Sequence, residues 1–155
     1  MIDPVKYPPL NLPIFEAKVR SEGNQVQIFD AIRKKYLVLT PEEWVRQHVI
    51  QYLIHEKNVP PSLIKLEYQI NYARVKKRPD IAVVHPDGYM WLIVECKAPS
   101  IPITKNVFDQ AVIYFSVEKP RFIALSNGID HVYCTLKLNA ENFVFIRDLP
   151  KFELS

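Results

Sequence analysis

The chain has 155 residues, of which 48% are hydrophobic and 24% are charged, and its formal net charge is +3. This length fits one domain, and this composition predicts a packed core and excludes an intrinsically disordered chain. The small positive charge permits an anionic partner but does not require one. Its three glycines, at positions 23, 88 and 128, cannot form a G-x-x-x-x-G-K-[ST] phosphate loop or a G-x-G-x-x-G fingerprint, which excludes nucleotide-driven motors and Rossmann enzymes.

The cysteines and the N-terminus indicate the cellular compartment. Cys96 and Cys134 each lie in an apolar run, which is typical of buried reduced thiols and not of a secreted disulfide framework. Residues 1–13 contain Asp3 and four prolines, where a signal peptide would need a positive end and an unbroken apolar run. No run of about 18 apolar residues occurs. We therefore expect a soluble, cytoplasmic protein with no membrane partner.

We expect residues 1–39 to form an N-terminal arm and a hairpin that pack on a main domain of residues 40–155. Alternating apolar residues on either side of Glu22-Gly23-Asn24 predict the hairpin: Phe15, Ala17, Val19, Val26 and Ile28. The main domain then begins with a helix from Pro41 to about Lys57. Thr40 is its expected N-cap, Pro41 its first residue, and Glu43 the partner that closes a capping box.

After this helix the hydrophobic period becomes strand-like. It predicts a three-stranded meander over 63–72, 79–85 and 90–97, with a turn at Asp87-Gly88. A second helix is expected over 105–117, capped by Thr104, and short strands over 121–126, 131–138 and 142–147. The resulting order is one helix, three strands, a second helix and further strands.

The meander places charged residues together. A symmetric connection centred on Asp87-Gly88 pairs positions whose numbers sum to 175, so Asp80 faces Glu95. Because side chains alternate along a strand, Glu95 and Lys97 share one face while Cys96 points to the other. The neighbouring residues are apolar, as in a strand that is covered on both faces. We therefore expect Asp80, Glu95 and Lys97 to converge at the open end of the hairpin.

Two facing carboxylates need a compensating charge. At about 5 Å and an effective dielectric of about 20 they repel by roughly 3 kcal/mol. Lys97, a shared proton or a divalent cation could relieve this repulsion, and Mg²⁺ fits because it prefers one or two protein carboxylates together with water and phosphate oxygens. Lys97 could then orient or activate a water molecule or stabilise developing negative charge. The alternative is a partly exposed salt-bridge cluster at a strand end.

These residues resemble a known motif. Arg78-Pro79-Asp80, fourteen further residues and then Glu95-Cys96-Lys97 are similar to the PD-(D/E)-x-K nuclease motif. The run Glu95-Cys96-Lys97-Ala98-Pro99 resembles in particular the N-terminal nuclease domain of type I restriction enzyme R subunits, over about residues 41–138. On the following helix, Gln110 and Tyr114 match the Q-x-x-x-Y signature of the RecB-like branch of these nucleases.

The resemblance implies a fold and a chemistry for a nuclease-like domain of residues 40–155. The fold would be α/β (α+β): a restriction-endonuclease-like αβββαβ core with a mixed central sheet flanked by helices. The activity would be Mg²⁺-dependent phosphodiester hydrolysis, with Mn²⁺ as a substitute metal. Asp80 and Glu95 would bind the metal and Lys97 would be catalytic.

Further residues are candidates for supporting roles. By analogy with the family, Gln110 and Tyr114, which are i, i+4 neighbours, would position the lysine and touch the DNA backbone, although ordinary helix packing also explains them. The family also places an acidic residue on the first helix. Glu42 suits this role better than Glu43, which capping explains, while the alternative is that both complement the helix dipole.

Four basic residues precede Asp80: Arg74, Lys76, Lys77 and Arg78. A backbone phosphate bound by them would lie beside the proposed metal site and add salt-sensitive affinity that does not depend on base sequence. The alternative is a solvated loop.

The sequence therefore predicts a Mg²⁺-dependent nuclease that hydrolyses DNA in restriction, defence or repair. Two alternatives stay open: a non-cleaving DNA- or protein-binding module with the same fold, and a junction-resolving or RNA-directed nuclease. Because the sequence contains no helicase motor, any translocation would come from a partner, with a separate motor or specificity subunit possible, or the protein works alone as a repair, recombination or defence nuclease. A homodimer, cleavage specificity, and endo- or exonuclease action are also left open.

Overall fold

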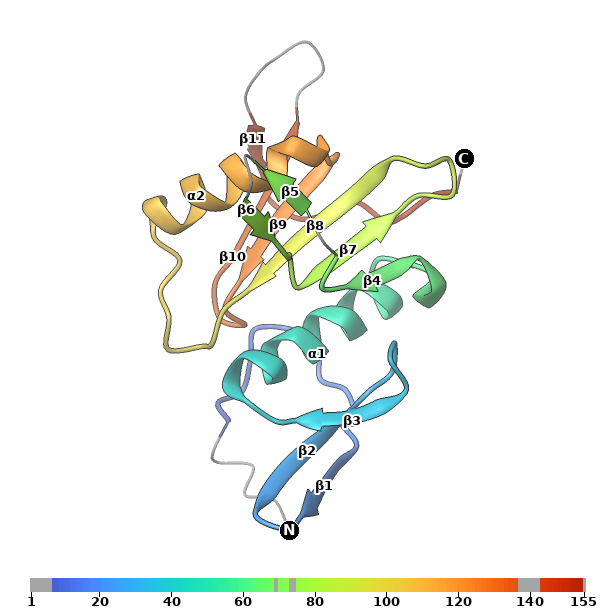
Figure 1. Cartoon of the computed structure of the whole chain (residues 1–155), viewed down its shortest axis with the longest axis vertical. Coiled ribbons are helices and arrows are strands. Elements are labelled where there is room, and N and C mark those ends of the chain that lie inside the picture. The colour runs from blue at the N-terminus through green and yellow to red at the C-terminus, as the bar shows by residue number, and fades with distance from the viewer. Residues whose placement is uncertain (1–6, 69, 73–74, 137–142, 155) are drawn as a thin grey trace.

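The computed structural model describes residues 7–68, 70–72, 75–136 and 143–154. A large sheet lies between two helices, and a small N-terminal sheet lies beyond the first helix (Figure 1). The small sheet has the order β1-β2-β3, with bounds Val19–Glu22, Gln25–Asp30 and Lys35–Val38. The helices are α1, Pro41–His55, and α2, Lys105–Phe115. None of the helices in the described part of the chain has the length and apolarity needed to cross a membrane.

The large sheet has six strands in the order β11-β10-β9-β8-β7-β4. Their bounds are Ile64–Leu66 for β4, Ile81–Val84 for β7, Met90–Cys96 for β8, Phe122–Ser126 for β9, His131–Leu136 for β10 and Phe143–Ile146 for β11. Strands β8 and β9 are parallel, and the other neighbouring pairs are antiparallel. A parallel pair needs a long crossover, and α2 supplies it. The expected mixed α+β architecture is therefore confirmed.

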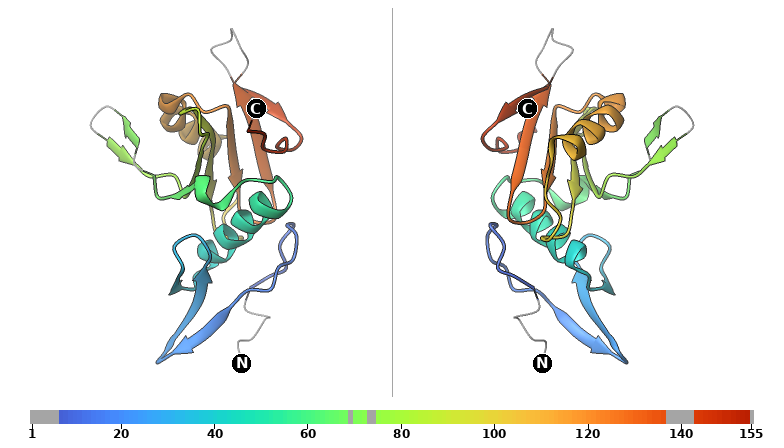
Figure 2. Two further views of the ribbon diagram at one scale, coloured as in Figure 1. Left: turned by 90° about the vertical axis from the view of Figure 1, so that its right-hand side faces the viewer. Right: turned by 90° about the vertical axis from the view of Figure 1, so that its left-hand side faces the viewer.

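The two helices cover opposite faces of this sheet (Figure 2). Val45, Val49 and Leu53 of α1 belong to a buried cluster that includes Ile81, Val83, Leu92 and Val94. Ala111 and Phe115 of α2 belong to a second cluster that includes Ala82, Ile93, Ile123 and Leu125. Alternate residues of β7 and β8 thus point into different clusters, which explains why both strands are apolar without interruption.

Helix α1 begins as predicted, but its capping box is incomplete. The Thr40 hydroxyl accepts a 3.0 Å hydrogen bond from the Glu43 amide, and Pro41 is the first helical residue. The Glu43 side chain, however, accepts hydrogen bonds from Arg46 and Gln47. A charged guanidinium is a stronger donor than a backbone amide, so the predicted role of Glu43 as a capping partner was wrong.

The predicted strand 63–72 was also wrong, because the chain leaves the sheet within it. A short 3-10 helix, η2, covers Pro61–Leu63, and β4 then ends at Leu66. Glu67 adopts a left-handed backbone with φ +53°. The next strand, β5 (Ile70–Tyr72), pairs with β6 (Val75–Lys77) in a separate two-stranded ribbon that extends away from the large sheet (Figure 2). The meander is therefore β4-β7-β8.

The N-terminal hairpin is confirmed, and it gains a third strand. In the hairpin Val19 pairs with Ile28 and Glu22 with Gln25, while β3 was not expected. This small sheet is joined to α1 through an apolar cluster of Tyr7, Ile28 and Leu39, against which Trp44 packs. The arm before it reaches the β9–β10 turn, where the Asn11 amide donates to the Gly128 carbonyl at 2.7 Å.

The C-terminal half matches the prediction closely. Thr104 caps α2 by accepting from the Val107 amide, and a 3-10 helix, η3 (Ser116–Glu118), replaces the last predicted turn. Residues 137–142, over which the last two predicted strands were to end and begin, lie outside the described residues.

Candidate active site

The register of the β7–β8 hairpin is the one that the sequence predicted. Ile81 pairs with Val94, Ala82 with Ile93, and Val83 with Leu92, so each pair sums to 175. The register shifts between Val83 and Val84, at the far end near the turn. Asp80 directly precedes β7, and Glu95 lies near the end of β8. The hairpin therefore holds these two carboxylates opposite each other at its open end.

Asp80 is fixed and largely withdrawn from water. Its Oδ2 accepts a 2.7 Å hydrogen bond from the backbone amide of Cys96. Burial, and after it the negative charge of Glu95, raises the pKa of Asp80 to about 7. The Cys96 amide and the Arg46 guanidinium act in the opposite direction without reversing the shift. Near neutral pH, Asp80 and Glu95 thus share a site that does not readily hold two negative charges.

Lys97 supplies a positive charge to this site. Its Nζ lies 3.7 Å from Glu95 Oε1, and the exposed fractions of the two side chains are 32% and 11%. The Lys97 amide donates to the Ser126 carbonyl at 2.8 Å, so β9 fixes the backbone where the chain leaves β8. The ammonium is therefore positioned by its backbone yet accessible to a ligand.

The first turn of α1 contributes a further carboxylate. Burial, and then the charge of Asp80, raises the pKa of Glu42, whereas the charge of Lys97 lowers it. Glu42 is thus close enough to interact with both residues, whereas Glu43 is engaged by Arg46 and Gln47. A hollow of about 240 Å³ adjoins these groups and is lined by Thr40, Glu42, Glu43, Arg46, Glu67 and Asp80. The geometry therefore favours Glu42 over Glu43 as the acidic residue from this helix.

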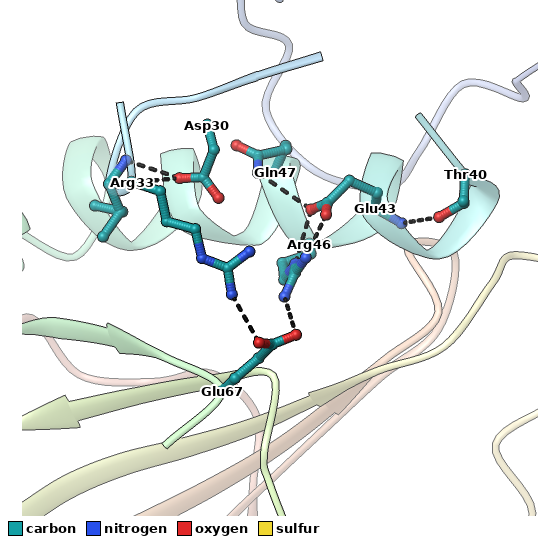
Figure 3. A network of polar contacts seen from close by, with 8 residues as sticks. Asp30, Arg33, Thr40, Glu43, Arg46, Gln47 and Glu67 are labelled. Carbon is teal, nitrogen blue, oxygen red and sulfur yellow. Dashed lines mark hydrogen bonds and ion pairs between the residues drawn. The ribbon is translucent and has the colours of Figure 1, made fainter. Parts of the chain in front are cut away.

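Sequence reasoning missed an ionic network beside the hollow (Figure 3). Arg46 pairs with Glu43, and its Nη1 lies 3.9 Å from Glu67 Oε1. Arg33 Nη2 lies 3.1 Å from Glu67 Oε2. The backbone amide of Glu67 donates to the Asp80 carbonyl at 3.3 Å. The i, i+3 spacing of Glu43 and Arg46 was a local signal for one of these pairs, but the contacts of Glu67 span distant segments.

Comparison with known proteins identifies the family. The model of the type I restriction enzyme R protein N terminus (HSDR_N) matches residues 41–150. The chain belongs to this family. A comparison with curated protein sequences finds no significant match. The resemblance based on Glu95-Cys96-Lys97 is confirmed. The match to the R protein N terminus begins at the first residue of α1, so it includes Asp80, Glu95 and Lys97 but not the small N-terminal sheet.

The R protein resemblance implied a Mg²⁺ site, with Asp80 and Glu95 as its ligands. Among the described residues, no group of three or more His, Cys, Asp or Glu side chains is arranged to hold a metal ion. Mg²⁺, however, is usually bound by one or two protein carboxylates, with water and phosphate completing its coordination. Asp80 and Glu95 fit that smaller donor set, because they are two adjacent carboxylates with an accessible hollow beside Asp80.

The Q-x-x-x-Y residues are less clearly placed. Gln110 is exposed on α2, and within the described part of the chain no hydrogen bond joins it to Asp80, Glu95 or Lys97. The side chain of Tyr114 lies outside what the structure describes. Their supporting role in this R-protein family member therefore stays a prediction.

The basic run before Asp80 is only partly described. Arg78 is exposed and is followed by the buried Pro79. Lys76 and Lys77 belong to β6, but their side chains, and all of Arg74, lie outside the described residues. Phosphate binding by these four residues stays a prediction as well.

Proposed function

We propose that the protein is a metal-dependent nuclease of the PD-(D/E)-x-K type that hydrolyses phosphodiester bonds of DNA. The observation that carries this proposal is the convergence of Asp80, Glu95 and Lys97 at the open end of the β7–β8 hairpin. Membership in the R protein N-terminal family supports a nuclease-related role and DNA as the substrate. We place this activity in restriction or in another defence or repair process.

Asp80 and Glu95 are the residues that would hold Mg²⁺, or Mn²⁺ in its place. Such an ion, when bound, polarises a phosphoryl oxygen and lowers the pKa of a water molecule. The protein contributes rigidity, because both carboxylates lie on or next to strands within a packed sheet. The Cys96 amide holds Asp80 Oδ2 in place, so the carboxylate is oriented before any ligand arrives.

Lys97 acts on the substrate side of the site. Its ammonium is a compact charge with three donors, and a third of the side chain is exposed. We infer that it donates a hydrogen bond to the attacking water or to a non-bridging phosphate oxygen, where negative charge grows in the transition state. Its ion pair with Glu95 holds this ammonium beside the two carboxylates.

The Asp80–Glu95 pair should also make metal binding depend on pH. With the pKa of Asp80 at about 7, the pair retains a proton in slightly acidic solution. To hold a cation, both carboxylates would have to be ionised, so metal binding would be coupled to release of that proton. The protein should therefore bind the metal more tightly at pH 8 than at pH 6.

A cleavage assay tests this proposal. Supercoiled plasmid and a labelled linear duplex are incubated with Mg²⁺, Mn²⁺ or EDTA and with the wild type, Asp80→Asn, Lys97→Ala or a control, Asp87→Asn. Asp87 lies in the β7–β8 turn with a side chain that is 75% exposed, at the opposite end of the hairpin from Asp80. We expect metal-dependent cleavage by the wild type and the control alone. Equal cleavage by all four proteins would indicate a contaminant, and DNA binding without cleavage would indicate a non-cleaving module.

A further inference from the structure

Three consecutive basic residues lie where the β2–β3 turn ends and β3 begins: Arg33 and Lys34 in the turn and Lys35 as the first residue of β3. This turn lies before residue 41 and so outside the segment that the family model matches. Figure 1 shows the turn rising from the small sheet to lie alongside α1, toward the end of β4. Its position makes it a candidate extension of the site that the matched segment does not contain.

The turn is held in a defined shape. Asp30 is fully buried, and its Oδ1 accepts hydrogen bonds from the Ile32 and Arg33 amides at 2.8 and 3.0 Å. The Asp30 carbonyl accepts a third, from the Lys34 amide, at 2.7 Å. Lys34 adopts a left-handed backbone with φ +55°. The side chains of Lys34 and Lys35 therefore leave the protein from fixed backbone positions.

Arg33 anchors this turn to the segment that carries Asp80. Its guanidinium binds the Glu67 carboxylate at 3.1 Å (Figure 3). The Glu67 amide in turn donates to the Asp80 carbonyl. Two contacts thus connect the basic turn to the carboxylate cluster. The turn therefore lies next to Glu67, which lines the hollow beside Asp80.

The other two basic residues keep their charge available. Lys34 and Lys35 are exposed, and neither takes part in an ion pair in the described part of the chain. Arg33, in contrast, is neutralised by Glu67. Lysine ammonium groups on a rigid turn beside a cleavage site bind phosphate without reading base sequence. The geometry points to Lys34 and Lys35 as a binding site for the phosphodiester backbone of DNA, outside the catalytic cluster. This inference rests on the proposed function.

A salt-dependent binding experiment tests this assignment. The affinity for a fluorescent DNA duplex is measured by anisotropy in EDTA, where no cleavage occurs, over a series of salt concentrations. The variants are Lys34→Gln/Lys35→Gln and a matched control, Lys119→Gln/Lys151→Gln. Lys119 is also left-handed, with φ +48°, and lies two residues before Arg121, whose amide donates to the Met90 carbonyl at the opposite end of β8 from the candidate site. Lys151 lines a hollow together with Arg121. Each double variant thus removes two charges and substitutes one left-handed lysine.

We expect the Lys34→Gln/Lys35→Gln variant to bind about tenfold more weakly or worse at 0.1 M salt. The slope of log affinity against log salt should fall in magnitude by about 1.8, because each lost phosphate contact removes about 0.9. The control variant should retain the wild-type slope, and Lys34→Arg/Lys35→Arg should retain both affinity and slope.

Equal slopes for the wild type and Lys34→Gln/Lys35→Gln would overturn the inference, as would an equal loss in the control variant. If the wild type itself binds no duplex at low salt, the proposed function fails and the inference fails with it. The two failures are therefore distinguishable. Circular dichroism of each variant verifies that it is folded before its affinity is interpreted.

Discussion

The backbone amide of Cys96 donates a 2.7 Å hydrogen bond to the side chain of Asp80. This bond joins the residue before β7 to the end of β8, and it stabilises the ionised form of Asp80. Burial and the charge of Glu95 outweigh it, so the pKa of Asp80 rises to about 7. The protein thus orients this carboxylate firmly and at the same time makes its negative charge unfavourable. That combination fits the proposed site, in which both carboxylates would be ionised when they hold a cation.

The first prediction concerns stability and pH. The folded-state pKa of Asp80, about 7, lies above its usual value of 3.8, so the folded protein binds more protons than the unfolded chain between these values. Stability should therefore fall as pH rises from about 4 to about 7. Asp80→Asn removes this charge while its amide oxygen can still accept the Cys96 hydrogen bond. In EDTA at pH 8 we expect the variant to be more stable than the wild type by on the order of 1–3 kcal/mol.

Urea denaturation at pH 5 and pH 8, with and without 10 mM Mg²⁺ or Mn²⁺, measures this effect. The advantage of Asp80→Asn should shrink at pH 5, where Asp80 is protonated in the folded wild type. The metal should stabilise the wild type and leave the variant unchanged. A variant that is less stable than the wild type at both pH values would show that the charge of Asp80 stabilises the fold, contrary to the prediction.

Glu42 and Glu43 allow a matched comparison, because they are adjacent glutamates with different surroundings. Glu42→Gln removes a charge near Asp80, so we expect weaker Mn²⁺ binding by calorimetry and a stability within about 0.5 kcal/mol of the wild type. Glu43→Gln weakens a buried pair with Arg46, which should lower the free energy of unfolding by about 1–3 kcal/mol. Mn²⁺ affinity should change less for Glu43→Gln than for Glu42→Gln. The reverse pattern would assign the site role to Glu43.

Substitution of Lys97 should reduce cleavage without weakening metal binding. Lys97→Ala removes a positive charge 3.7 Å from Glu95, so Mn²⁺ affinity should stay the same or increase. Cleavage should fall by about 100-fold or more, since the residue is proposed to act on water or phosphate. Lys105→Ala is the control, because that exposed lysine pairs only with Asp109 among the described ion pairs. A parallel loss of metal affinity and cleavage in Lys97→Ala would show that the lysine organises the carboxylates instead.

The accuracy of the sequence analysis depended on how local each interaction is. The β7–β8 hairpin could be predicted in register because a short turn and two apolar strands determine its pairing, and the approach of Asp80 to Glu95 followed from simple arithmetic. The N-caps Thr40 and Thr104 were likewise readable, since each acts on a residue three positions later.

The errors have a common physical cause, which is competition from side-chain partners that the predicted pattern did not include. Glu43 matched the capping pattern, but Arg46 and Gln47 bind its side chain instead. The strand predicted over 63–72 breaks at Glu67, whose left-handed backbone fits a residue with partners in three separate segments: Arg33, Arg46 and Asp80. The contacts of Glu67 join segments that are far apart in the sequence, so no local pattern contains them. The same limit explains why the network beside the hollow was not foreseen.

The last prediction concerns the contact between the N-terminal arm and the β9–β10 turn. Gly128 has φ +87°, and a methyl group added to it would lie 2.7 Å from Leu10 Cδ2 and 3.1 Å from Val45 Cγ2. Gly128→Ala should therefore cost about 1–2 kcal/mol from the backbone and a further amount from the clash with Leu10. In a Leu10→Ala background the clash with the leucine disappears, but the backbone cost remains.

Urea denaturation of the two single variants and the double variant tests this reasoning. We expect the double variant to be more stable than the sum of the single effects predicts, by about 0.5–2 kcal/mol. Strict additivity would show that the arm does not confine Gly128. The outcome also matters for the candidate site, because the carbonyl of Ser126, two residues before Gly128 at the end of β9, accepts a hydrogen bond from the Lys97 amide. If Gly128→Ala displaces that carbonyl, cleavage should decrease more than the loss of folded protein explains, and Leu10→Ala should restore part of it.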